Sequence, residues 1–111
     1  KNTRDIQNIQ DVKAYLQDHP EDRIASLKIL GVRFGLNEYK LKKGFKELYQ
    51  TSVFKYQMQQ RLLKARHLIK VTTDPLSSIA LQTGFKSYVH FGQAFKKEFG
   101  VAPSQYRKTH Q

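Results

Sequence analysis

Apolar side chains recur at helical spacing along most of this chain. The first such stretch predicts an amphipathic helix over residues 5–18, whose apolar face is made by Ile6, Ile9, Val12 and Leu16. The same spacing, interrupted by Gly and Pro, predicts helices over residues 26–34, 38–49, 52–70, 75–83 and 88–99, and a last helix that begins at Pro103. Because no stretch alternates apolar and polar residues as a strand does, we predict an all-α fold of about seven helices.

Residues typical of helix ends mark the turns between these helices. Asn37 is a suitable N-cap for the helix that follows it, and Asp74 is well suited to cap a helix that has Pro75 in its first position. Gly35 fits a turn that needs a positive φ angle, and Gly100 fits a helix C-cap. The helices are therefore expected to follow one another through short turns.

The second half of the chain repeats the first in degenerate form. At an offset of 49 residues the matches are Leu27 with Leu76, Leu30 with Ile79, Gly31 with Ala80, Gly35 with Gly84 and Leu36 with Phe85. At an offset of 50 they are Leu41 with Phe91, Gly44 with Ala94, Phe45 with Phe95, Lys46 with Lys96, Tyr49 with Phe99 and Tyr56 with Tyr106. Each copy reads as a helix, a glycine turn and a basic helix, which is the order of a helix-turn-helix that reads DNA.

This repeat predicts the domain organisation. We expect two helix-turn-helix subdomains of the homeodomain-like kind, residues 1–51 and 73–111, joined by a long central helix within residues 52–72. The central segment is rich in helix formers and contains no Gly or Pro, so ~19 residues of continuous helix would span ~28 Å.

The charge of the chain favours a polyanionic partner, with nucleic acid ahead of an acidic membrane surface. Twenty Lys and Arg residues stand against nine Asp and Glu residues, for a net charge of +11. Residues 25–111 hold sixteen of the basic and four of the acidic side chains. The first helix is therefore expected to be nearly neutral and to cover part of a basic protein.

Several classes of protein are disfavoured by the composition. The chain has no Cys, and its four His residues show no metal-ligand spacing, so we expect no disulfide, zinc site or other cofactor. No apolar run approaches the ~20 residues of a membrane span and no signal peptide is evident, so we expect no membrane partner and a cytoplasmic location. Since the chain begins at Lys1 without an initiator Met, we expect an excised domain or processed fragment.

The two basic helices are the candidate reading elements. Placing residues at ~100° intervals puts Leu41, Phe45 and Leu48 on the inner face of the first, with Tyr39, Lys43 and Lys46 outside and Lys40 and Lys42 flanking them. In the second, Phe91 and Phe95 point inward with Tyr88 and Phe99 beside them, and Val89, Gln93 and Lys96 point outward. The outward residues occupy the same three positions in both copies.

The outward side chains suggest a division between base reading and phosphate contact. Gln93 can pair with adenine, Lys43 can donate to guanine, and Val89 or Tyr39 can pack on a thymine methyl. His90 is either a phosphate contact or an ordinary surface histidine. The remaining cations suit phosphate: Lys40, Lys42, Lys46, Lys96 and Lys97.

These residues resemble the DNA-binding domain of the AraC/XylS family of bacterial transcription regulators. The resemblance rests on Ile79-Ala80, Gly84-Phe85, Phe91, Phe95-Lys96-Lys97, Gly100, Pro103 and Tyr106-Arg107, and extends back through Arg61-Leu62 and Ala65 to Leu27. It implies two helix-turn-helix units on a rigid central helix that enter successive major grooves. It also implies base reading by Tyr39, Lys42 and Lys43 in the first unit and by Val89, Gly92 and Gln93 in the second.

The first copy departs from the family pattern. Gly31 stands where the family favours Ala, and Gln50 and Val53 stand where the second copy has Gly100 and Pro103. Gly44 lies inside the reading helix and should cost it ~0.5–1 kcal/mol relative to Ala. A need for close helix packing explains Gly44 better than a hinge does.

The favoured function is sequence-specific binding of double-stranded DNA, on the bacterial nucleoid, as part of a transcription regulator. The resemblance adds RNA polymerase as a further partner and an effector-binding or dimerisation domain outside this chain, so the isolated domain is expected to be monomeric. An enzyme is disfavoured because there is no Cys nucleophile and no convergent acid-base cluster. The alternative is a nonspecific nucleic-acid or anionic-surface binder that acts by charge.

Overall fold

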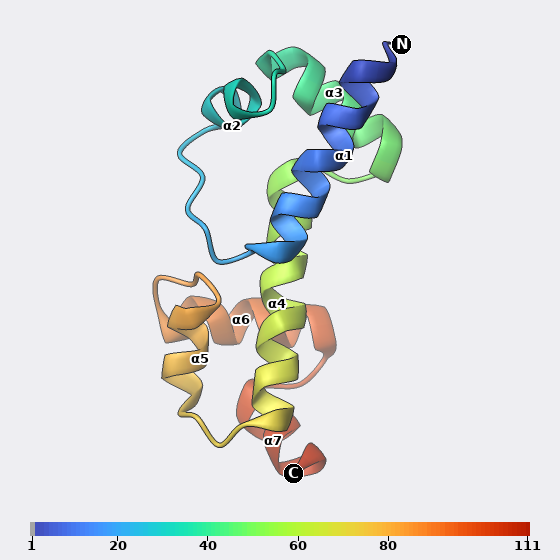
Figure 1. Ribbon diagram of the computed structural model, residues 1–111. Coiled ribbons are helices and arrows are strands. Elements are labelled where there is room, and N and C mark those ends of the chain that lie inside the picture. The colour runs from blue at the N-terminus through green and yellow to red at the C-terminus, as the bar shows by residue number, and fades with distance from the viewer. Residues whose placement is uncertain (1) are drawn as a thin grey trace. The chain divides into compact units, whose positions relative to one another are not determined.

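The computed structural model describes residues 2–111, in which helices joined by turns and loops are the only regular secondary structure (Figure 1). The helices are α1 Thr3–Asp18, α2 Leu27–Arg33, α3 Glu38–Tyr49, α4 Val53–Val71, α5 Leu76–Gln82, α6 Tyr88–Phe99 and α7 Pro103–His110. The predicted all-α class is confirmed. The chain forms two compact units that meet within α4, the first ending at Met58 and the second beginning at Gln59.

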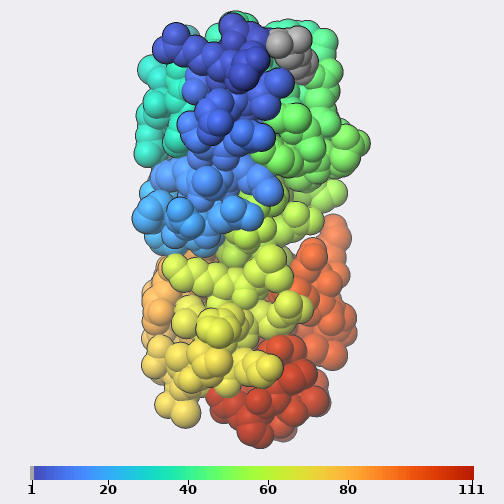
Figure 2. Space-filling view, turned by 45° about the vertical axis from the view of Figure 1, so that its right-hand side comes forward, coloured from blue at the N-terminus to red at the C-terminus, as the bar shows by residue number. Residues whose placement is uncertain are grey.

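The first unit is built around α1, whose outer face is exposed at the surface (Figure 2). Ile9, Val12 and Leu16 of α1 are buried, as the periodicity predicts, although Ile6 is only half-buried. The rest of this core comes from α2, α3, the turn between them and the first residues of α4: Leu30, Leu36, Leu41, Phe45, Val53 and Tyr56. Helix α1 is therefore a packing helix for the helix-turn-helix formed by α2 and α3.

The second unit repeats this arrangement with α4 in the role of α1. Leu62, Ala65 and Ile69 of α4 are buried and have the same spacing as Ile9, Val12 and Leu16 of α1, at an offset of 53. They share a unit with the buried residues of α5 and α6, which are Ile79, Ala80, Phe91 and Phe95. The internal repeat thus includes the helix that precedes each helix-turn-helix.

The turns of the two helix-turn-helix units have the same backbone geometry. Gly35 and Gly84 have φ angles of 73° and 100°, in the region that side chains disfavour. The next residue then donates its N–H to a carbonyl of the preceding helix, Leu36 to Gly31 at 2.8 Å and Phe85 to Ala80 at 3.0 Å. The predicted positive φ at Gly35 is confirmed.

Asn37 caps α3 as predicted, because its Oδ1 accepts the Lys40 N–H at 2.8 Å. The prediction for α5 is wrong: the cap residue is Pro75, no side chain caps this helix, and the Pro75 carbonyl accepts from Ile79. The carbonyl of Asp74 instead accepts from Arg107 Nη1 at 2.6 Å.

Arg107 of α7 holds the turn between α4 and α5 from outside. Its guanidinium donates to the carbonyls of Ile69, Thr72 and Asp74 over 2.6 to 3.3 Å. A planar guanidinium suits several acceptors at once, so this turn needs no side-chain cap. The family match at Tyr106-Arg107 therefore includes a residue with a structural role.

The two recognition helices end in the same conformation but with different residues. Gly100 has φ 84° and donates its N–H to the Lys96 carbonyl at 2.8 Å, and Gln50 has φ 60° and donates to the Lys46 carbonyl at 2.8 Å. Gln50 also donates from Nε2 to the Glu47 carbonyl at 3.0 Å. A side chain in this left-handed region carries a steric penalty of about 1 kcal/mol, so the first unit is strained where the second is not.

Replacing Gln50 by Gly should raise the free energy of unfolding by about 0.5–1 kcal/mol, because glycine reaches the left-handed conformation without that penalty. Urea denaturation followed by circular dichroism measures the change. Gly100→Gln is the matched control and should destabilise the protein by about 1 kcal/mol. A less stable Gln50→Gly variant would mean that the hydrogen bond from Gln50 to Glu47 outweighs the backbone strain.

Candidate nucleic-acid interface

Helix α3 separates a buried face from a basic one. Leu41 and Phe45 are fully buried, whereas Tyr39 is 67% exposed. Leu48 was predicted to point inward, and this is wrong, since 41% of its surface is exposed. The reason is the position of α1, which contacts α3 at Gly44 and leaves Leu48 at the rim of a shallow hollow beside Ile9.

Helix α6 shows the same separation. Phe91 and Phe95 are fully buried, and Phe99 is half-buried with its ring centroid 4.7 Å from that of Phe95. Tyr88 is exposed but lies against Phe91, with 6.0 Å between ring centroids. The predicted outward residues, Val89, Gln93 and Lys96, are all exposed, Val89 to 68%, and Lys97, a predicted phosphate contact, is exposed as well.

The outward residues of α3 form one wall of a groove of about 680 Å³. Four of the five predicted residues of this helix line it, namely Tyr39, Lys42, Lys43 and Lys46, opposite Leu27, Ser52, Val53 and Phe54. The Lys43 ammonium lies 5.6 Å from the Tyr39 ring centroid, within range of a cation–π interaction. Three cations on a partly apolar wall suit an anionic ligand that also has flat apolar groups, as DNA has.

Lys40 and His90 each contact a residue that lies outside their own helix. These residues occupy matched positions at the offset of 50. The Lys40 ammonium lies 3.3 Å from the Asp5 carboxylate of α1. The His90 ring meets Phe85 edge-on, with centroids 5.8 Å apart. Both residues are exposed, so each side chain contacts protein and solvent.

The glycines of the two recognition helices serve different purposes. A Cβ on Gly44 would lie 2.3 Å from Cδ1 of Ile9, so α1 can approach α3 only because this position has no side chain. The close-packing interpretation of Gly44 is confirmed. A Cβ on Gly92 would have no neighbour within 4 Å, so nothing in its own unit requires a glycine there.

These two glycines predict opposite effects of the same substitution. Gly44→Ala should lower the free energy of unfolding by about 1–3 kcal/mol, because Ile9 must move. Gly92→Ala should raise it by about 0.5–1 kcal/mol, because alanine is the better helix former and meets no obstacle. Thermal denaturation of the two variants tests the contrast. Equal stability of Gly44→Ala and the wild type would show that α1 adjusts at no cost.

Within residues 2–111, no group of three or more His, Asp or Glu side chains could hold a metal ion. In the same part of the chain, every helix is too short or too polar to cross a bilayer.

Comparison with known proteins identifies the family of this site. A profile described as a helix-turn-helix domain matches residues 30–109. The HTH-type transcriptional regulator MtrA of Neisseria gonorrhoeae is 36% identical over 91 residues, which cover 82% of this chain and 30% of MtrA. The chain belongs to the AraC/XylS family. It corresponds to the helix-turn-helix DNA-binding domain of these transcription regulators, which are not a class of enzyme.

Two further AraC/XylS comparisons extend this result. The transcriptional activator RhaS of Escherichia fergusonii is 33% identical over 95 residues, covering 86% of this chain and 34% of RhaS. The chain thus spans about a third of the length of these two relatives. The crystal structure of the DNA-binding domain of AdpA, in complex with a target DNA, has the same fold with a TM-score of 0.84, 22% identity and coverage of 91% and 90%.

Two side-chain contacts in the first unit were not predicted from the sequence. Asp5 lies in the packing helix and gives no sign in the sequence that it faces Lys40. Gln57 is buried in α4 and donates from Nε2 to the Asp22 carbonyl at 2.7 Å, which ties the segment after α1 to α4. Gln57 stands among other glutamines in the same segment, so the sequence did not show that this one would be buried.

Proposed function

We propose that this domain binds double-stranded DNA in a sequence-specific manner and controls transcription in bacteria, with α3 and α6 as its recognition helices. One observation carries the proposal: both helices bury apolar side chains at the same two positions, 41 and 45 in α3 and 91 and 95 in α6, and expose the same three outward positions, 39, 43 and 46 in α3 and 89, 93 and 96 in α6. A protein that binds polyanions by charge alone has no need for two helices with matched faces. The nonspecific alternative is therefore not favoured.

Base reading is assigned to the positions that the resemblance to the AraC/XylS family implies. In α6 these are Val89, Gly92 and Gln93, where Gln93 offers the donor and acceptor that adenine requires. The open space at Gly92 supports close approach of a base pair, since a glycine with no packing role costs helix stability for no gain inside the protein. In α3 we assign base reading to Tyr39, Lys42 and Lys43.

Phosphate contact is assigned to the cations at the edges of these faces. Lys46 and Lys96 are matched by the repeat, exposed and about one turn beyond the base-reading residues. Lys97 extends the same edge in α6. A point charge on a flexible stem suits a phosphate, whose position changes little with sequence.

We propose that the two recognition helices enter successive major grooves on one face of the duplex. The helix that links the two units, α4, contains 19 residues. At 1.5 Å per residue it extends about 28 Å, of the order of the ~34–36 Å of one DNA turn. The DNA-binding domain of AdpA, which has the same fold, is known in complex with a target DNA, and this supports DNA as the partner.

Partners beyond DNA follow from the family. RNA polymerase is the proposed partner for activation, in line with the description of RhaS as an activator. We further propose that oligomerisation and effector binding reside in a domain outside this chain, and that the protein acts in the cytoplasm on the nucleoid. The isolated domain should then bind DNA as a monomer.

Selection of bound sequences from a random duplex pool tests the proposed function. We expect one asymmetric site with two boxes about one helical turn apart, because one chain supplies two different recognition helices. DNase protection on the selected duplex measures the spacing. A palindromic motif, or a single short box, would count against tandem reading, and recovery of no motif would favour binding by charge alone.

Gln93→Ala should weaken binding to the selected site by ~1–3 kcal/mol and relax the preference at one base pair, with much less loss on random DNA. The contrasting variant is Lys96→Ala, which should weaken all sequences about equally and flatten the salt dependence slightly. Fluorescence anisotropy over single-base variants of the site measures both. An unchanged base profile for Gln93→Ala would move the reading role to Val89, Gly92 or His90.

A further inference from the structure

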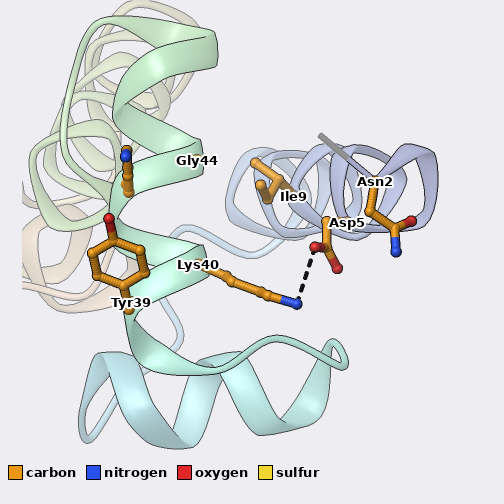
Figure 3. A pocket seen from close by; sticks show the side chains of 7 residues that line it. Asn2, Asp5, Ile9, Tyr39, Lys40 and Gly44 are labelled. Carbon is orange, nitrogen blue, oxygen red and sulfur yellow. Dashed lines mark ion pairs between the residues drawn. The ribbon is translucent and has the colours of Figure 1, made fainter.

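The ion pair between Asp5 and Lys40 joins the packing helix α1 to the recognition helix α3 (Figure 3). The two charged atoms are 3.3 Å apart, and the Asp5 side chain is 20% exposed while that of Lys40 is 52% exposed. Figure 3 shows Lys40 extending toward α1, away from Tyr39 on the outward face of α3. The two residues, with Asn2, Ile9, Tyr39, Lys43 and Gly44, line a pocket of about 210 Å³.

The ion pair accompanies the close packing of α1 against α3. Ile9 meets Gly44 at a separation that leaves no room for a Cβ. Asp5 precedes Ile9 by four residues and Lys40 precedes Gly44 by four residues, which is about one helical turn in each case. The two helices thus contact each other at Ile9 and Gly44 and again, one turn earlier in each, at Asp5 and Lys40.

The two residues that match Asp5 and Lys40 in the repeat do not form such an ion pair. The offset of 53 that relates the buried residues of α1 to those of α4 places Met58 at the position of Asp5. The offset of 50 places His90 at the position of Lys40, and His90 lies against Phe85. At this matched position α1 carries an acidic side chain and α4 carries an apolar one.

We propose that Asp5 is a positioning residue that keeps the Lys40 ammonium away from the DNA backbone. The first unit then binds DNA with one cation fewer than its sequence offers, and α1 sets the affinity and salt dependence of the recognition helix it supports. This inference rests on the proposed DNA binding. It also changes the assignment of Lys40, which the sequence alone predicted to be a phosphate contact.

The physical basis is competition between two anions for one ammonium group. A DNA phosphate must displace the Asp5 carboxylate before Lys40 can neutralise it, and the carboxylate is already in place because α1 is packed. Each phosphate that a lysine neutralises steepens the dependence of log K on log salt concentration by about 0.9. A lysine held by Asp5 contributes little to that slope, and a released lysine contributes fully.

The experiment measures binding of the whole chain to the selected duplex by fluorescence anisotropy between ~50 and ~200 mM salt. Asp5→Asn should tighten binding about three- to tenfold at the low-salt end and steepen the slope by ~0.9. Asp11→Asn is the matched control, since it removes one negative charge from an exposed position of α1 with no ion pair to α3 among the described contacts. It should tighten binding less than twofold and leave the slope unchanged.

Variants of Lys40 test the same pair from the other side. Lys40→Ala should leave the slope close to that of the wild type, whereas Lys46→Ala should lower it by ~0.9. The double variant Asp5→Asn with Lys40→Ala should return the slope to the wild-type value, and Asp5→Glu should retain it. Circular dichroism checks folding, and Lys40→Ala decides the question by itself if Asp5→Asn fails to fold.

Two results would overturn the inference while leaving DNA binding intact. One is equal behaviour of Asp5→Asn and Asp11→Asn, which would reduce the effect to net charge. The other is a slope for Lys40→Ala as low as that for Lys46→Ala, which would make Lys40 an ordinary phosphate contact. Failure of the wild-type chain to bind any duplex would instead refute the proposed function.

Discussion

Burial of one phenylalanine on the back of each recognition helix is the constraint on which the rest of the structure depends. Phe45 packs against Tyr49 and Tyr56 with ring centroids 4.9 and 5.7 Å apart. Phe95 packs against Phe99 and Tyr106 at 4.7 and 5.9 Å, which are the same three positions at the offset of 50. Burial of each phenylalanine contributes ~1.5–3 kcal/mol, and edge-to-face contacts add to it, so these clusters fix which side of each helix faces outward.

The two units meet this constraint with different supporting contacts. In the first, α1 comes close to α3 because Gly44 has no side chain, and Gln50 accepts backbone strain at the end of the helix. In the second, Ala94 stands at the position that matches Gly44, and Gly100 ends the helix without strain. Arg107 ties α7 to the turn between α4 and α5. The second unit therefore has the less strained recognition helix.

This difference bears on how the two units would divide the work of binding. The outward face of α3 carries three lysines beside Tyr39, and that of α6 carries Gln93 beside Val89 and a glycine, with two lysines, Lys96 and Lys97, at its edge. Lysines attract phosphates of any sequence, whereas an amide discriminates between bases through paired donors and acceptors. The composition of the faces favours α6 as the main source of specificity and α3 as the main source of electrostatic affinity.

Much of the fold followed from the sequence because it depends on the period of one helix at a time. The angle between side chains is set by 3.6 residues per turn, so Leu41, Phe45, Phe91 and Phe95 could be placed inward with no knowledge of their neighbours. Glycine turns could be recognised for the same local reason, since a positive φ angle restricts the residue itself.

Contacts between helices were decided by the tertiary structure alone. Leu48 lies beside the contact between α1 and α3, which forms at Gly44 because this residue has no side chain. Asp5 meets Lys40 through the packing of the same two helices. Arg107 binds carbonyl oxygens, which every residue has and which leave no mark in the sequence. The sequence by itself thus determined which face of each recognition helix is exposed. Whether a cation of these helices pairs with an acidic side chain of another helix, as Lys40 does with Asp5, depends on how the helices pack. Only the tertiary structure defines that packing.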